Sequence, residues 1–315
     1  MLIALVSLVS LGGVAAPRAS HASELPPELV FVPDAGVRIY DAGQPAPVLM
    51  EDGSICLFYN IAHGPNTPGR REVACSEDGL TFPEEGQAPH SVEVINPFAV
   101  RLPDGMWRLY AMNEDTGIMT SRRSADGVRF APEDGVRYTA PPEHLPLGVR
   151  DFFVNADGDV IFLYIGHRDG EDAHIRLAVS TDGGDTFTLH TDDPLGDLEK
   201  DDRQDRNVDP KFTPLPDGGA RLFTMVPGVV PIPGQRACCV VASFTTPDGY
   251  TYTPDPGVRL RTDDFTEFAV WSLNDPWVIR LPDGRFRMYV AGLLAEKVGQ
   301  GQVVILSATT PPVEP

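Results

Sequence analysis

The sequence is short of basic residues and of segments free of proline and glycine. Against 45 Asp and Glu residues it has 25 Lys and Arg, which gives a formal charge of −20 at pH 7. Nucleic acids and anionic membranes are bound through basic faces, so neither is an expected partner. The 315 residues include 31 prolines and 30 glycines, which interrupt any long helix. With 42% hydrophobic residues the chain still has enough for a full core, so we expect a turn-rich β protein.

Long apolar segments are also scarce, and the clearest lies at the N-terminus. Residues 1–16 are almost wholly apolar or small, and Ser20-His21-Ala22 places small residues where signal peptidase requires them. The segment is short for a membrane span and has no basic residues before it. We expect residues 1–22 to be a signal peptide of a secreted or periplasmic protein. An N-terminal anchor or a buried strand is the alternative.

A strand–turn–strand unit recurs five times along the rest of the chain. In each copy an alternating apolar run meets an Asp-Gly turn, and a second run follows that ends in an aromatic residue, the pattern of a β-hairpin. The copies are Pro45–Tyr59, Pro97–Tyr110, Asp151–Tyr164, Pro210–Phe223 and Pro276–Tyr289. The turn aspartates fall at positions 52, 104, 157, 217 and 283, so the unit repeats at intervals of 52, 53, 60 and 66 residues.

A second motif, Ser-x-Asp-Gly followed by an aromatic residue, comes after the first three hairpins. The copies begin at Ser76, Ser124 and Ser180, and a looser copy begins at Thr246. This motif resembles the Asp-box of sialidase-type propellers, a turn between the third and fourth strands of a blade. The resemblance implies that the Ser and Asp side chains bond the turn backbone and that the aromatic residue fills the blade core.

The fifth repeat is incomplete, because the chain ends soon after Ser307. The missing strand has a counterpart at the other end: the Phe31–Arg38 segment matches Phe130–Arg137 and Tyr252–Arg259. We therefore expect residues 23–315 to form a single all-β domain, a five-bladed β-propeller of four-stranded antiparallel blades. In it, the N-terminal strand, about residues 30–40, completes the last blade, which begins near residue 275, and this removes open sheet edges. A β-sandwich of the same hairpins is the alternative.

The four cysteines are consistent with export. Cys56 and Cys75 fall on neighbouring predicted strands, so a disulfide between them is sterically feasible. Cys238 and Cys239 are adjacent in the sequence and point to opposite faces of a strand, which favours one buried and one partly exposed thiol over a vicinal disulfide. No cysteine spacing resembles a zinc site.

The first strand of each blade in a propeller lines the central channel, and ligands bind at its mouth. The residues that begin these inner strands are therefore the expected site. They are Gln44, Asn96, Asp151, Asp209 and Asp275, and most precede a proline, which favours an extended approach of the chain. Three carboxylates and two amides around one pocket suit a polyhydroxylated ligand.

The five repeats and the Asp-Pro inner strands resemble glycoside hydrolase family 43, the arabinanase and β-xylosidase type. The resemblance implies an inverting hydrolase with an Asp base, a Glu acid and a second Asp that orients the acid. Asp209, Asp275, Asp151 and Glu267 are the candidate catalytic residues. The first inner strand departs from the family pattern, because it carries Gln44 where a base is expected, with Asp41 three residues earlier.

Several further residues are candidates for binding. Arg150 and Arg206 are candidates for an arginine cluster of the sialidase kind, and Trp271 and Trp277 for a sugar-stacking platform, with a place between blades as the alternative. His63, His167 and His174 have no matching second ligand, so we expect no metal site there. The acidic segment 192–209 suits calcium by composition but lacks the Asp-x-Asp-x-Asp-Gly spacing, so a solvated insertion is favoured and no cofactor is expected.

These observations favour an exported, monomeric carbohydrate-active protein, a glycoside hydrolase or sialidase-like enzyme with carboxylates at the mouth of the channel. The alternative is a non-catalytic propeller that binds a glycan or a protein. Phosphodiester chemistry is opposed by the negative charge and by the lack of a metal triad.

Overall fold

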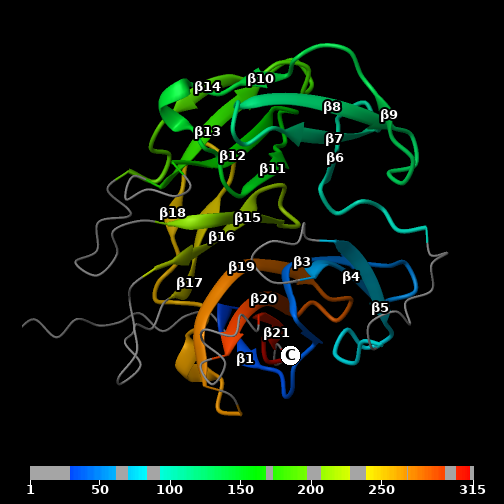
Figure 1. Ribbon diagram of the computed structural model, residues 1–315, viewed down its shortest axis with the longest axis vertical. Coiled ribbons are helices and arrows are strands. Elements are labelled where there is room, and N and C mark those ends of the chain that lie inside the picture. The colour runs from blue at the N-terminus through cyan, green and yellow to red at the C-terminus, as the bar shows by residue number, and fades with distance from the viewer. Residues whose placement is uncertain are drawn as a thin grey trace, which may run out of the picture.

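Five antiparallel sheets surround a common centre in the computed structural model (Figure 1). It describes residues 29–61, 70–83, 93–167, 173–196, 207–227, 239–267, 269–294 and 303–312. The predicted five-bladed β-propeller is confirmed. The predicted signal peptide, residues 1–22, lies outside the described residues.

Each blade begins with its inner strand and adds strands outward in chain order, except that the outermost strands of blade 5 come from the N-terminal part of the chain. Blade 1 contains β3 (Ala42–Leu49), β4 (Ile55–Ile61) and β5 (Arg71–Ser76) among the described residues. Blade 2 contains β6 (Ala99–Arg101), β7 (Trp107–Met112), β8 (Ile118–Ser124), β9 (Ala131–Pro132) and β10 (Tyr138–Thr139). Blade 3 contains β11 (Arg150–Val154), β12 (Val160–Gly166), β13 (His174–Ser180) and β14 (Thr188–Thr191).

Blades 4 and 5 complete the ring. Blade 4 contains β15 (Val208–Pro214), β16 (Ala220–Val226), β17 (Val240–Thr246) and β18 (Thr253–Pro254). Blade 5 contains β19 (Val270–Arg280), β20 (Phe286–Leu294) and β21 (Val303–Thr309), followed by β1 (Val32–Pro33) and β2 (Ile39–Tyr40). Two short 3-10 helices, η2 (Pro142–His144) and η4 (Thr262–Asp264), lie in connections.

The Asp-Gly turns form the inner hairpins as predicted. All five turn glycines, Gly53, Gly105, Gly158, Gly218 and Gly284, have positive φ values between 83° and 91°. An L side chain is disfavoured in this conformation, so the glycine is required at each turn. The two inner strands that each turn joins are paired antiparallel in every blade.

The N-terminal strand closes the ring. Val32 pairs with Thr309 and Ile39 with Ile305, so the first and last strands that the structure describes lie side by side in blade 5 (blue and red in Figure 1). Asp34 reinforces this pairing by accepting hydrogen bonds from Ser307 Oγ at 2.7 Å and Thr309 Oγ1 at 2.9 Å. The expected closure by about residues 30–40 is confirmed.

Two other blades have an acidic residue at the position equivalent to Asp34. Glu133 accepts a hydrogen bond from Ser121 Oγ at 2.7 Å, and Asp255 accepts one from Ser243 Oγ at 2.5 Å. Each acid also faces an arginine of its own blade. The pairs are Arg108 with Glu133 at 2.8 Å, Arg221 with Asp255 at 3.3 Å and Arg287 with Asp34 at 3.8 Å. The internal repeat therefore extends to its buried charges.

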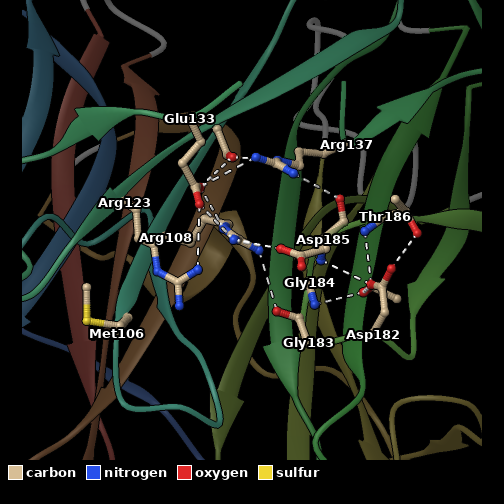
Figure 2. A network of polar contacts seen from close by, with 12 residues as sticks. Met106, Arg108, Arg123, Glu133, Arg137, Asp182, Gly183, Gly184, Asp185 and Thr186 are labelled. Carbon is tan, nitrogen blue, oxygen red and sulfur yellow. Dashed lines mark hydrogen bonds and ion pairs between the residues drawn. The ribbon is translucent and has the colours of Figure 1, made fainter. Parts of the chain in front are cut away.

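Arg108 also joins blade 2 to blade 3. Figure 2 shows its guanidinium between Glu133 and the turn Asp182–Thr186, where Arg108 Nη2 lies 2.8 Å from Asp185 Oδ1. The same turn accepts a hydrogen bond from Tyr110 at Gly184 O, at 3.0 Å. Blade 5 contacts blade 1 in the same way, through Tyr289 and Gly79 O at 2.7 Å. The Ser-x-Asp-Gly turns thus hold neighbouring blades together.

Both cysteine predictions have an outcome in the structure. Cys56 and Cys75 form a disulfide between β4 and β5, as their predicted positions allowed. Cys239 is buried and disulfide-bonded, so the prediction of a thiol at this position is wrong. The local backbone explains the error, because the φ of 149° at Cys239 departs from the regular strand geometry on which that prediction relied. Cys238 lies outside the described residues.

Candidate functional site

A cavity of about 760 Å³ opens where the inner strands of four blades begin. Blade 1 contributes Gly43 and Gln44, and the segment before β11 contributes Gly148 and Val149. Blades 4 and 5 contribute Val208, Asp209, Asn274 and Asp275. The cavity therefore lies where these inner strands begin, and three of the five candidate residues line it.

The backbone at three of these positions is unusual for residues other than glycine. Gln44, Asp209 and Asp275 have φ values of 51°, 54° and 50°. Each lies before a proline within a break in strand register. The predicted extended approach is therefore wrong at these positions, because a bulge inserts extra residues and turns the chain. Such conformations cost about 1–3 kcal/mol and are typical of functional sites.

Asp209, which is buried, and Asp275, which is partly buried, form an acidic pair where blades 4 and 5 meet. The backbone N–H of Asp275 donates a hydrogen bond to Asp209 Oδ2 at 3.2 Å. Burial raises the pKa of Asp275, and the negative charge of Asp209 raises it further, to about 7. Burial also raises the pKa of Asp209. One member of the pair can therefore hold a proton near neutral pH while the other is ionised.

Gln44 occupies the equivalent position in blade 1. Its Oε1 accepts a hydrogen bond from Asn60 Nδ2 at 2.5 Å, and Asn60 also lines the cavity. Because the Gln44 Oε1 atom accepts this hydrogen bond, the NH₂ group of the Gln44 amide can donate to a ligand. The two acids and this amide give the cavity both proton-transfer groups and a hydrogen-bond donor.

Lys211 is a site residue that the sequence analysis missed. It is buried, and its Nζ donates a hydrogen bond to Arg150 O at 2.8 Å and lies 4.6 Å from the ring centre of Trp277. Its positive charge opposes the burial that raises the pKa values of both Asp209 and Asp275. A usable signal was present, because a single lysine occurs in an inner strand two residues after Asp209.

Asp151 belongs to the contact between blades 3 and 4 and is not among the residues that line the cavity. Its Oδ2 accepts a hydrogen bond from the Phe212 backbone N–H at 2.7 Å. Burial raises its pKa, while Lys211 opposes this rise. Asp151 takes the place that a proline has in blades 4 and 5, one residue further along than Asp209 and Asp275, and its side chain faces the neighbouring blade.

Two candidate residues lie elsewhere. Asn96 is used locally, because its Oδ1 accepts a hydrogen bond from the Phe98 N–H at 3.0 Å. Glu267 is exposed, and its Oε2 accepts a hydrogen bond from the Gly36 N–H at 2.7 Å. Neither residue lines the cavity with Asp209 and Asp275. Each instead satisfies a backbone donor, a common role of carboxylates and amides in loops.

The structure places the remaining binding candidates in different surroundings. Trp277 packs edge-to-face on Phe98 with ring centres 5.4 Å apart, next to Lys211. Trp271 is partly buried on β19 and does not line the cavity. Arg150 contacts Glu114 at 3.2 Å. Arg206 lies outside the described residues.

The described residues contain no group of three or more His, Cys, Asp or Glu side chains placed to hold a metal ion. His63 and residues 197–206 of the acidic segment lie outside these residues. Asp192, at the start of the acidic segment, contacts His144 at 2.9 Å. No helix in the described part of the chain is long and apolar enough to cross a bilayer.

Comparison with known proteins shows the fold. No family model matches the chain, and no curated protein matches it. An alpha-L-arabinofuranosidase from Podospora anserina in complex with cellotriose has a similar structure, with a TM-score of 0.54 and 14% identity over 90% of this chain and 95% of that chain. An endo-arabinase from Bacteroides thetaiotaomicron has a TM-score of 0.52 and 11% identity over 90% and 98%.

A thermostable family-43 glycoside hydrolase is also similar, with a TM-score of 0.52 and 12% identity over 90% of this chain and 97% of that chain. These three solved structures share the architecture of this chain across nearly its whole length. At such low identity the likeness establishes the shared propeller fold.

Proposed function

We propose that the protein is a glycoside hydrolase whose working carboxylates are Asp209 and Asp275. The observation that carries the proposal is the hydrogen bond from the Asp275 backbone to the Asp209 carboxylate, at a site where burial and the charge of Asp209 raise the pKa of Asp275 to about 7. Glycoside hydrolysis requires one carboxyl group that donates a proton and one that is ionised. The fold is shared with three hydrolases of carbohydrates, which supports the same class of substrate.

The chemistry follows from the two protonation states. Asp275, protonated near neutral pH, donates its proton to the glycosidic oxygen as the bond to the anomeric carbon breaks. Asp209, ionised, takes a proton from the water that attacks that carbon. The proton gained by Asp209 replaces the one lost by Asp275 once the product leaves, so the reaction consumes only water. Gln44 contributes a hydrogen bond to a sugar hydroxyl.

The test is hydrolysis of a panel of aryl glycosides and polysaccharides by the wild-type protein and by Asp209→Asn and Asp275→Asn. We expect turnover by the wild type and a loss of about 10²- to 10⁴-fold in each variant, the usual contribution of general acid–base catalysis. Asp263→Asn, an exposed aspartate on η4, is the matched control and should retain activity. Turnover that is unaffected in the first two variants refutes the proposal. Binding of a glycan without turnover favours a non-catalytic propeller.

A further inference from the structure

Three cationic residues from three blades lie close together beside the cavity, and two of them contact the same aromatic ring. Arg71 of blade 1 lies 4.2 Å from the ring centre of Phe98, and Lys211 of blade 4 lies 6.0 Å from the same ring. Lys211 in turn contacts the backbone of Arg150 in blade 3. This concentration of positive charge is unexpected in a chain with a net charge of −20.

The cluster adjoins residues that line the cavity. Arg71 Nε donates a hydrogen bond of 3.4 Å to Asn60 Oδ1, and Asn60 lines the cavity together with Gln44. Arg150 directly follows Val149, which also lines the cavity. The charge of Arg150 acts on Arg71, so the two guanidinium groups lie near one another at the edge of the cavity.

The three cations differ in how their charge is balanced. Lys211 is surrounded by acids, since its charge acts on Asp151, Asp209 and Asp275. Arg150 shares its charge with Glu114. Arg71 forms no salt bridge with any acid in the described part of the chain, and the charged group that acts on it is the like-charged Arg150. Arg71 and Arg150 therefore present an excess of positive charge at the rim of the cavity.

We propose that the cavity takes a glycan with a carboxylate-bearing sugar, such as a uronic acid, and that Arg71 and Arg150 bind its carboxylate beside the Asp209–Asp275 pair. This inference rests on the proposed function and specifies its substrate class. A planar guanidinium binds a carboxylate through two parallel hydrogen bonds, which are stronger than neutral ones. The arginines also offset the repulsion between an acidic sugar and the buried acids.

The test measures binding, so that it does not depend on turnover. Trigalacturonate, cellobiouronate and 3′-sialyllactose are titrated by calorimetry against wild-type protein, each beside its neutral counterpart, the methyl ester or the parent sugar. We expect at least one acidic sugar to bind more tightly than its counterpart, with an affinity that falls as salt is added. A sulfated disaccharide beside its desulfated form shows whether a carboxylate is required or any anion suffices.

Arg71→Gln and Arg150→Gln should each weaken binding of the acidic sugar about 10- to 100-fold, the range of a charge-assisted hydrogen bond, while the neutral counterpart is unaffected. Arg71→Lys should restore part of the loss. Arg280→Gln, an exposed arginine at the far end of β19, is the matched control. The inference is overturned if no acidic sugar binds more tightly than its neutral counterpart, or if the preference survives in both variants. Preferential binding without hydrolysis would refute only the proposed catalysis.

Discussion

The backbone N–H of Asp275 donates to the carboxylate of Asp209, which joins the inner strands of blades 4 and 5 at the channel mouth. The contact is possible because both residues occupy left-handed positions before a proline, at equivalent bulges of the repeat. Two copies of one structural unit thus place two acids in one buried environment.

Stability should depend on pH through Asp275. Its pKa of about 7 in the folded protein exceeds that of an aspartate in the unfolded chain, about 4. The folded state therefore keeps a proton that the unfolded state loses, and the free energy of unfolding falls as pH rises from about 4 to 7. Asp275→Asn lacks this titrating group. Urea denaturation should therefore show that its free energy of unfolding, relative to that of the wild type, rises by more than about 1 kcal/mol between pH 4 and pH 7. A difference that stays constant with pH would contradict the raised pKa.

Replacing Lys211 should shift the pH dependence of activity. The lysine charge lowers the pKa of both Asp209 and Asp275, so Lys211→Met should raise both. If Asp275 donates a proton, activity falls as pH rises through its pKa, and the variant should lose activity at a higher pH than wild type. The pH profile of kcat/KM measures this shift, with Arg280→Gln as the control. A profile that is unchanged or moves to lower pH would count against the assigned role of Lys211.

The repeated acid of the outer strands should be important for stability. Glu133→Ala leaves Arg108, which is 1% exposed, with Asp185 as its remaining acidic partner. Glu133 is only partly buried and Arg108 keeps Asp185, so the expected cost is that of the lost charge-assisted hydrogen bonds, about 1.5–3 kcal/mol. Denaturant unfolding should therefore show a loss of this order for Glu133→Ala and little change for Asp134→Ala, its exposed neighbour. Equal stability of the two variants would show that the network contributes nothing.

The disulfide of blade 1 should stabilise the fold to a similar extent. Cys56 and Cys75 are separated by 19 residues, and a cross-link that closes a loop of this size contributes about 3 kcal/mol. The Cys56→Ser/Cys75→Ser double variant should unfold at lower denaturant concentration than wild type under oxidising conditions. A reductant should destabilise the double variant less than the wild type, because only the disulfide of Cys239 remains to be reduced in it. Equal midpoints for both proteins in oxidising buffer would contradict this contribution.

The fold could be predicted because its signals are local and repeated. Asp-Gly turns specify hairpins within about fifteen residues, and the match between Phe31–Arg38 and Phe130–Arg137 predicted the ring closure. The details of the site depend on contacts between blades, for which the sequence has no local signal. Lys211 makes such contacts with the rings of Phe98 and Trp277, and Glu267 makes one by accepting a hydrogen bond from the Gly36 N–H. The bulges were missed because proline alone indicates an extended chain.

The most direct test of the central claim is a double-mutant cycle on turnover with Asp209→Asn, Asp275→Asn and the variant that carries both. Groups that act as one catalytic unit show strongly non-additive losses. We therefore predict that the turnover of the double variant is at most a few-fold lower than that of the less active single variant. Losses that multiply, or single variants that hydrolyse glycans at the wild-type rate, would contradict a paired acid and base at the channel mouth.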